Sequence, residues 1–388
     1  MRLTAWGVVA LAVAVIRNQL WASPNLAFFT AISTHLGSNP FGHGVDGDYL
    51  LTNLLGPTIA RALGQTQPHE YARLHVVLLV VGLALVVAAV YRRFGYSPAR
   101  LLCILLAAAP VTTVAMEWLG QPDALTLPLA LGIVIARRRT SVALLAVLIG
   151  LNHAEQGVMI AGIGAVVATV IGDEPGTETT ADARGFARRA LPHLATMLGG
   201  VVVGRLLVEA YLRLEDIVVT KPRTAYLDLG VSGFVHHHLQ SPWLLYSLLG
   251  PLWALAIVVA VRCLRRDPAM ERRSWGLLGI ALAAAVLPML VTLDETRVYG
   301  LITAPVLVGA AVLASRATWP AWLASPRLLL VGTVLLAAAP GMFNAGESYW
   351  APALHPREFA RFLVDGSHPG DLTTWLLQPF GFRVPTAK

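Results

Sequence analysis

The stretch Val76-Val-Leu-Leu-Val-Val-Gly-Leu-Ala-Leu-Val-Val-Ala-Ala-Val-Tyr-Arg-Arg93 is apolar without interruption until it ends in two arginines. It belongs to an apolar run over 72–91, and about 20 such residues are what a helix needs to cross a bilayer. The run is too long and too dense for a β-barrel strand, in which polar and apolar residues alternate. It therefore predicts a transmembrane helix, which satisfies its own backbone hydrogen bonds in lipid.

Ten further apolar runs follow the same pattern, so residues 1–341 predict one all-α, polytopic transmembrane bundle of about eleven spans, with a short tail at 342–388. The ten runs are 3–22, 99–118, 124–136, 141–152, 157–171, 191–210, 243–261, 275–292, 299–314 and 327–341. Three of them, between 124 and 171, are short, so each is either extended by polar neighbours or a half-span. We interpret the first run as a retained span rather than a cleaved signal peptide, because Arg17 and Asn18 interrupt it.

Charge gives the orientation. Only 13% of the residues are charged, against about 25% in an ordinary soluble domain, so most of the surface must face lipid. The net charge of +7 comes from arginines in short clusters between the runs, a pattern that excludes a nucleic-acid-binding face. With eleven spans, these clusters all fall on one side, which the positive-inside tendency makes cytoplasmic: Arg92/Arg93, Arg137–Arg139, Arg184/Arg188/Arg189, Arg262/Arg265/Arg266/Arg272/Arg273 and Arg316/Arg327.

The other side then receives the connections 23–71, 119–123, 152–156, 211–242 and 293–298, and the tail. The first of these contains two candidate amphipathic surface helices, Asn25 to His35 and Tyr49 to Leu63, with a turn-rich segment between them. Two cysteines are too few for a disulfide framework or a cysteine-based metal site, and no Walker A loop is present.

The first candidate site motif is Asp46-Gly-Asp48-Tyr49, in the first outer connection. Two carboxylates beside a glycine can converge on one small site, where they would hold a metal ion or provide a general base. Alternatively, Asp48 only caps the helix that starts at Tyr49.

Two shorter motifs follow at the outer ends of later spans. Gln121-Pro-Asp123 matches ordinary helix-start chemistry, which is the interpretation we favour for it. In Asn152-His153-Ala-Glu155-Gln156, ionisable side chains lie at or just below the membrane surface, where they are costly and usually face a polar cavity. We therefore expect His153 and Glu155 to be functional.

The fourth motif is Asp294-Glu295-Thr-Arg297. Arg297 begins a helix, where a cation is unfavourable against the helix dipole, and it lies on the side where arginine is depleted. A phosphate or carboxylate partner resolves both objections, since the guanidinium fork matches either anion. Asp294 itself is one such partner.

The fifth motif is His236-His-His238, with Lys221 and Arg223 in the same connection. Adjacent histidines point in different directions on a regular element, so they make a poor metal site. We favour a solvated loop, although Lys221 and Arg223 can attract an anionic head group.

The layout and the Asp46-Gly-Asp48-Tyr49 motif resemble the GT-C superfamily of integral membrane glycosyltransferases. The resemblance covers residues 1 to about 341, and it implies sugar transfer from a polyprenyl-phosphate donor with inversion. In that case the catalytic aspartate corresponds to Asp46 or Asp48, and the phosphate-binding cation to Arg297. The chain departs from the family's common pattern because its tail is short and it has no large outer domain.

The resemblance thus predicts a multi-pass enzyme of the cytoplasmic membrane and cell envelope, with its active site on the extracytoplasmic face. Its partners would be a polyprenyl-phosphate-linked sugar, a glycan or lipid-linked acceptor and membrane lipid, but no nucleic acid. Asp123, Gln121, His153, Glu155, Tyr49, His236 and the acids Asp294 and Glu295 would help to bind the donor or its sugar. Whether a divalent cation takes part stays open. The alternative is a transporter or flippase for a lipid-linked or anionic solute, which would need ionisable groups at the membrane midplane.

Overall fold

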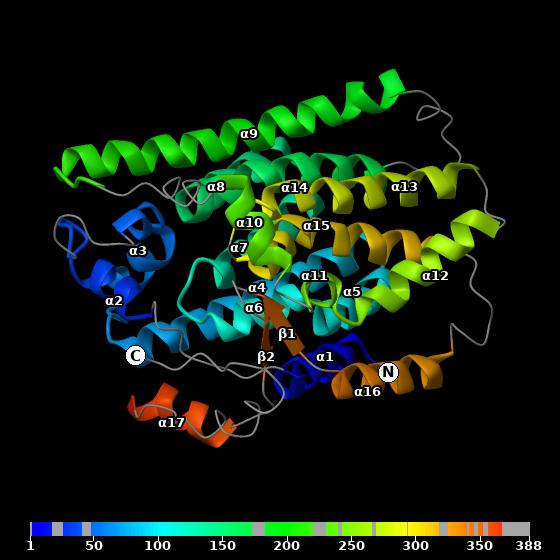
Figure 1. Ribbon diagram of the computed structural model, residues 1–388, viewed down its shortest axis with the longest axis horizontal. Coiled ribbons are helices and arrows are strands. Elements are labelled where there is room, and N and C mark those ends of the chain that lie inside the picture. The colour runs from blue at the N-terminus through cyan, green and yellow to red at the C-terminus, as the bar shows by residue number, and fades with distance from the viewer. Residues whose placement is uncertain are drawn as a thin grey trace.

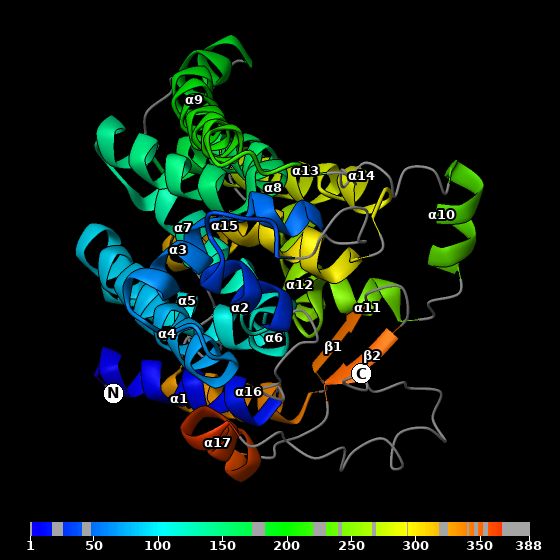
Figure 2. The same ribbon diagram turned by 90° about the vertical axis from the view of Figure 1, so that its left-hand side faces the viewer.

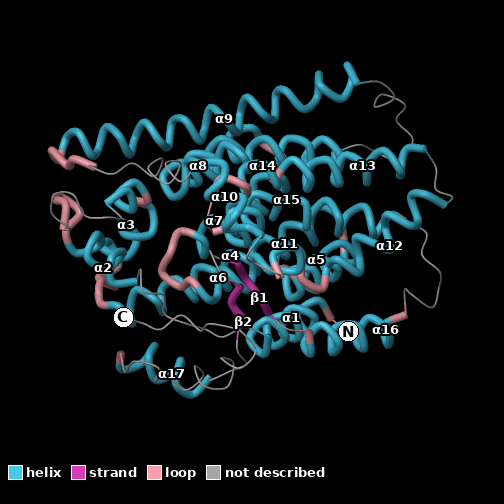
Figure 3. The backbone as a smooth tube through the Cα atoms, viewed as in Figure 1, coloured by secondary structure: helices cyan, strands magenta, loops and turns pink. Residues whose placement is uncertain are grey.

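The computed structural model describes residues 2–17, 26–40, 48–172, 183–219, 230–239, 243–265, 269–292, 294–317, 325–339, 341–344, 348–351 and 356–366. Long helices lie side by side in one bundle (Figures 1 and 2). The predicted all-α fold is confirmed. The described residues add one small antiparallel hairpin that was not predicted, β1 (Gly341–Asn344) with β2 (Ser348–Ala351) (Figure 3).

Every one of the eleven predicted runs contains helix in its described part. The long helices are α1 (Leu3–Arg17), α4 (Pro68–Phe94), α5 (Tyr96–Ala108), α7 (Asp123–Ile135), α8 (Arg139–Gly172), α9 (Ala183–Leu214), α12 (Leu252–Arg265), α13 (Ala269–Ala284), α15 (Glu295–Arg316) and α16 (Pro326–Ala338). The shorter ones are α2 (Leu26–Thr34), the 3-10 helix η1 (Asp48–Thr52), α3 (Leu55–Ala62), α6 (Pro110–Glu117), α10 (Gly230–Leu239), α11 (Leu244–Leu249), α14 (Val286–Met289) and α17 (Pro356–Asp365).

By length and composition, four described helices are long and apolar enough to cross a membrane: α4, α8, α9 and α15. The pair α5 and α6 meets the same criterion together but bends by 62° between its two parts. Helices α1, α7 and α12 are apolar but shorter. The structure therefore supports a multi-pass membrane protein, whereas the count of eleven spans stays a prediction.

Helix α8 reverses direction at its middle. A straight helix of its 34 residues would be about 50 Å long. Instead Arg139 and Gly172, its first and last residues, line the same cavity of 340 Å³. His153 has the non-helical angles φ −161° and ψ 70°, which place the reversal there. Helix α8 is thus a pair of antiparallel arms joined at 152–156, as the two separate apolar runs predicted.

Small residues let α9 approach α8 closely (Figure 1). A Cβ atom added to Gly204 would lie 2.3 Å from the carbonyl oxygen of Val147, and one added to Gly150 would lie 2.3 Å from that of Val201. Lipid tails are as apolar as leucine, so helix association in a membrane depends on such close packing rather than on the hydrophobic effect. The glycines therefore fix the position of the turn at 152–156.

The break between α5 and α6 is stabilised by Arg17. Pro110 has no N–H group, so the break leaves backbone carbonyls of α5 without their helical donors. Arg17 donates from Nη1 to the Ala107 carbonyl (2.6 Å) and from Nε to the Ala339 carbonyl (3.1 Å). The C-terminal ends of α1, α5 and α16 therefore meet at one buried cation, which their dipoles favour.

We name the two ends of the bundle the inner and the outer end, after the orientation that the sequence predicts. At the inner end, Arg93 donates to the carbonyls of Val134 and Ile135, and Arg316 donates to that of Ile171. At the outer end, the amide of Leu54 donates to the carbonyl of Leu151, which attaches the first outer connection to the turn of α8. Helix α17 packs against α4 at the same end. Among the described residues, Arg93 and Arg316 thus lie at the end of the bundle opposite the turn of α8, whereas the side of the membrane that each end faces stays a prediction.

Candidate functional site

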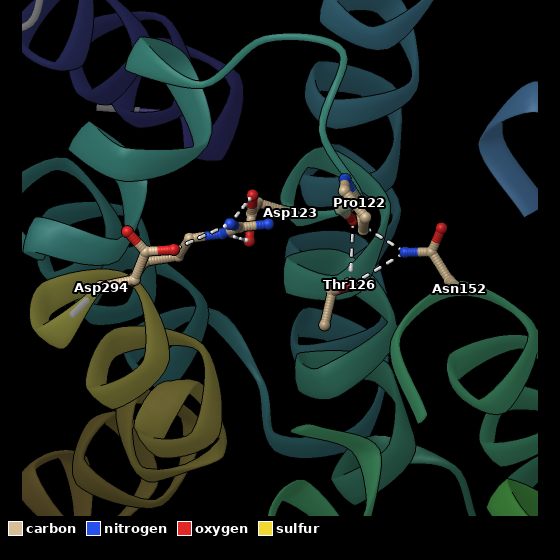
Figure 4. Close-up of polar contacts among 6 residues, drawn as sticks. Pro122, Asp123, Thr126, Asn152 and Asp294 are labelled. Atoms are coloured by element: carbon tan, nitrogen blue, oxygen red, sulfur yellow. Dashed lines mark hydrogen bonds and ion pairs between the residues drawn. The ribbon is translucent and has the colours of Figure 1, made fainter. Parts of the chain in front are cut away.

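Arg297 is the centre of a buried ion-pair cluster at the outer end. Its Nε atom lies 2.9 Å from both carboxylate oxygens of Asp123, and its Nη1 atom lies 3.3 Å from Oδ2 of Asp294 (Figure 4). Asp123 is completely buried and Arg297 is 8% exposed. The Nη2 amine makes no hydrogen bond within the described part of the chain, so one edge of the guanidinium stays available.

The local sequence explains this arrangement. Arg297 lies in the first turn of α15, where the helix dipole opposes a cation. Asp123 is the first residue of α7, where the dipole favours an anion. The first turns of α7 and α15 lie side by side. The Asp123 carboxylate, which its own helix dipole favours, therefore offsets the Arg297 charge, which its own helix dipole opposes. The expected partner Asp294 is present, and Asp123 adds a second carboxylate that the sequence alone did not pair with it.

The cluster is recessed below the outer surface of the bundle. Helix α7 has only 13 residues, or about 20 Å of length, against a hydrocarbon thickness of about 30 Å. Its inner end is tied to Arg93 at the end of α4. Its outer end, Asp123, therefore stops short of the level that α4 reaches with its 27 residues.

The turn of α8 forms the wall next to Asp123. Asn152 donates from Nδ2 to the carbonyl of Pro122 (2.8 Å) and to Oγ1 of Thr126 (2.9 Å) (Figure 4). Thr126 in turn donates to the Pro122 carbonyl. This network fixes the start of α7, and with it the Asp123 carboxylate. His153 is completely buried beside Asn152.

Helix α10 contributes a histidine from the opposite direction. Nδ1 of His238 lies 3.0 Å from Oε1 of the buried Glu295, and Nε2 lies 3.1 Å from the carbonyl of Leu290. Both partners offer an acceptor oxygen to a ring nitrogen of His238. The described cluster thus comprises the Arg297 guanidinium, the His238 ring and the carboxyl groups of Asp123, Asp294 and Glu295.

The first outer connection reaches the same place. The Tyr49 phenol lies near enough to Arg297 to interact electrostatically with its guanidinium. Tyr49 belongs to η1, which begins at Asp48. Asp46, Lys221, Arg223 and the side chain of Asp48 lie outside the described residues, so their positions toward Arg297 stay predictions.

Several buried polar side chains near these segments have no hydrogen-bond partner among the described residues. Both amide atoms of Gln121 and of Gln156 are in this state, as is the hydroxyl of Thr113. Buried amides and hydroxyls are almost always satisfied in native proteins, and each exception calls for an unseen water or ligand. Gln121 directly precedes Pro122 and Asp123, so a polar ligand or water is expected beside the ion-pair cluster.

Two predicted site residues lie away from the cluster. Glu155 is half exposed and faces Arg205 of α9 at 3.9 Å. His236 is exposed on α10, which forms a helix where we expected a solvated loop. Among the described residues, no group of three histidine, cysteine, aspartate or glutamate side chains could hold a metal ion.

Sequence reasoning missed the structural importance of Asn152, Thr126 and His238. Asn152 is the first residue of the motif at 152–156, but we predicted a function only for its ionisable neighbours His153 and Glu155. Thr126 stands three residues after Asp123, the spacing that puts two side chains on one face of a helix, and this signal could have identified it. His238 and Glu295 are 57 positions apart in the sequence, so no local sequence pattern predicts their contact.

No protein-family profile matches the sequence, and no curated protein matches it. Among solved structures, the fold is similar to that of ArnT from Cupriavidus metallidurans, whose crystal structure is of the apo state. The TM-score is 0.43 and the sequence identity 18%, over 86% of this chain and 63% of that chain. The chain therefore spans less than two thirds of the length of ArnT. A similarity at this TM-score and identity assigns no family and no function to the chain.

Proposed function

We propose that this protein is a GT-C-like membrane glycosyltransferase that takes a sugar from a polyprenyl-phosphate donor on the extracytoplasmic face. The observation that carries the proposal is the convergence of separate outer segments on one recessed cluster. Tyr49, Asp123, Asn152 and Arg297 come from η1, α7, α8 and α15, and their contacts join all four segments. A cluster near one end of the bundle suits a reaction at the membrane surface.

The proposed chemistry is a single displacement with inversion. An acceptor hydroxyl attacks the anomeric carbon, and the bond from that carbon to the phosphate oxygen breaks. The carboxylate of Asp46 or Asp48 takes the hydroxyl proton as general base. The polyprenyl phosphate leaves with the bonding electron pair, and a cation next to the leaving oxygen stabilises the developing charge.

Arg297 is the residue that we assign to the leaving phosphate. Asp123 and Asp294 hold its Nε and Nη1 atoms and leave Nη2 for the ligand. The fixed guanidinium needs no reorganisation during the reaction, which is what makes such electrostatic stabilisation effective.

An apolar cavity of 540 Å³ supplies a place for the polyprenyl chain. It lies between α1 and α4 to α6, and its lining includes Val80, Leu106 and Leu119. Val8, another lining residue, is 67% exposed, so the cavity opens at the surface of the bundle that faces lipid. Leu119 lies two residues from Gln121, which would bring the end of the chain close to the cluster.

The test is sugar release in proteoliposomes that contain the full chain and one polyprenyl-phosphate-linked sugar at a time. Polyprenyl phosphate formation is measured for the wild type and for Asp46→Asn and Asp48→Asn. Loss of a general base should lower the rate by about 10²–10⁴-fold in one of the two variants. Asp216→Asn is the matched control, because Asp216 is exposed in the outer segment after α9 and asparagine tolerates its positive φ of 54°. Wild-type rates in both Asp46 and Asp48 variants would refute the assignment of the base.

A specific feature favours the alternative of a transporter or flippase. The bent pair of α5 and α6, with Arg17 at the break, is similar to the discontinuous helices that form transporter binding sites. The same proteoliposomes distinguish the two functions. A transporter moves the intact sugar-linked lipid between leaflets without forming polyprenyl phosphate. We prefer the enzyme because Arg17 is already bonded to two carbonyls, whereas the Arg297 cluster retains an open edge.

A further inference from the structure

We propose that the inner end of α4 carries a binding site for an anionic phospholipid, separate from the sugar site. A cavity of 360 Å³ lies there, and its lining has two chemically different halves. Leu85, Ala88, Ala89 and Ile135 form the apolar half, whereas Arg92, Arg93 and Arg137 form the cationic half. No acidic side chain of the described residues lines it.

Mutual repulsion among the arginines makes this site attractive to an anion. Arg93 lies near enough to Arg137 and Arg316 for their charges to repel one another. Arg93 is fixed by its bonds to the carbonyls of Val134 and Ile135, which position it without neutralising its charge. Arg92 and Arg137 are exposed at the edges of the cavity. A phosphate group between them would offset the repulsion, and the guanidinium fork matches its oxygens.

The apolar half decides between a lipid and free phosphate. Val77, Val81 and Leu85 are spaced four residues apart on α4 and are 50%, 51% and 66% exposed. They form a continuous apolar ridge on the lipid-facing side of the helix. Leu85 and Arg92 are separated by about 10 Å along the helix axis at 1.5 Å per residue. An acyl chain along the ridge would therefore end with its phosphate at the arginines.

Basic pockets between helices on the cytoplasmic side are an established means of binding anionic head groups. Here the cavity is large enough for a head group, since small-molecule sites start at about 300 Å³. It does not need to hold the whole lipid, because the ridge accommodates the acyl chains. The site is on the end of the bundle opposite Arg297, so the proposal does not depend on the proposed glycosyltransferase activity.

The test is native mass spectrometry of the full chain in neutral detergent, titrated with phosphatidylglycerol or with the zwitterionic phosphatidylcholine. We expect phosphatidylglycerol to bind more tightly, and Arg92→Gln and Arg137→Gln to weaken its binding about fivefold each. The matched control is Arg138→Gln, which removes the same charge from the neighbouring exposed position but does not line the cavity. This control should leave the affinity unchanged within a factor of about two.

Three outcomes would overturn the proposal. Equal affinity for the two lipids would show that the arginines do not recognise charge. Equal weakening by Arg137→Gln and Arg138→Gln would show diffuse attraction rather than a built site. Displacement of the lipid by millimolar inorganic phosphate would indicate a site for free phosphate. Thermal unfolding of each variant is recorded alongside, and an unchanged midpoint shows that a lost affinity does not come from lost folding.

Discussion

The two ends of the bundle use the same residue, arginine, in opposite ways. At the outer end, Arg297 is buried and held by the carboxylates of Asp123 and Asp294. At the inner end, Arg92 and Arg137 are exposed, and no described acidic side chain lines their cavity. The inner arginines match the positive-inside tendency, which orients a membrane protein without needing partners. The outer arginine is buried, so its charge is tolerated only beside anionic partners.

This difference has an energetic basis. A buried ion must be paired, and removal of one partner leaves an uncompensated charge that costs about 3–5 kcal/mol. An exposed charge is hydrated and screened, so its removal changes the free energy of unfolding by less than about 0.5 kcal/mol. Variants at the two ends can therefore be ranked in advance.

The largest effect is expected for Asp123→Asn. This change keeps the shape of the side chain but leaves Arg297 buried with only the longer contact to Asp294. The free energy of unfolding in mixed detergent micelles should fall by about 3–5 kcal/mol. Its counterpart at the inner end, Arg138→Gln, should change the same quantity by less than about 0.5 kcal/mol.

The double variant Asp123→Asn/Arg297→Gln separates charge from shape. It removes both charges, so it should recover part of the stability that the single variant loses. A double variant that is less stable than Asp123→Asn would mean that Arg297 stabilises the fold through its other contacts even without the Asp123 carboxylate. The unpaired buried charge would then not be the main cost, and the comparison of the two ends would lose its basis.

A middle-sized effect is expected where α9 fixes the turn of α8. In Gly204→Ala the new methyl group would lie 2.3 Å from the Val147 carbonyl oxygen, so the helices must separate. We expect a loss of about 1–3 kcal/mol in the free energy of unfolding. Gly199→Ala is the matched control, because a Cβ atom there meets nothing within 4 Å. Equal stability of the two variants would refute the close contact.

The smallest effect at the outer end is expected for Glu155→Gln. Its partner Arg205 lies 3.9 Å away, and the two side chains are 49% and 33% exposed. Exposed pairs contribute about 0–1 kcal/mol, so the free energy of unfolding should change by less than about 1 kcal/mol. A larger loss would show that an exposed charge pair at the outer end can matter as much as a buried one. Burial could then not be used to rank the stability of the variants.

Much of the fold was predictable because long apolar runs in a sequence identify membrane helices. The runs on either side of residues 152–156 indicated two spans, and the reversal at His153 agrees with them. The break at Ala109 was not predicted, although Pro110 follows it directly and proline is the residue that most often breaks a helix. The size of the bend depends on tertiary partners such as Arg17, which the sequence does not reveal. The hairpin of β1 and β2 was missed because it forms beyond the apolar runs.

The need of Arg297 for an anionic partner was predictable from the sequence, but its pairing with Asp123 was not. A cation at the start of a helix is unfavourable, so Arg297 indicated an anionic partner. The structure shows two such partners, Asp123 and Asp294. The choice of Asp123 depends on α7 and α15 lying side by side, and 174 residues of sequence separate the two charges. Local chemistry shows that a group needs a partner, whereas only the packing of helices shows which one it finds.

The hydrogen bonds of Arg17 limit the order in which the helices of this protein can assemble in the membrane. Arg17 belongs to the first helix, and one of its acceptors, the Ala339 carbonyl, lies 322 residues later in the chain. At about 5–20 residues per second, the ribosome needs roughly 15 to 60 s to reach that acceptor after it has made the donor. During this time the arginine must remain near the hydrated membrane surface, because a half-satisfied cation is costly in hydrocarbon. Closure of the bundle around α1 is therefore among the last steps of its assembly in the membrane.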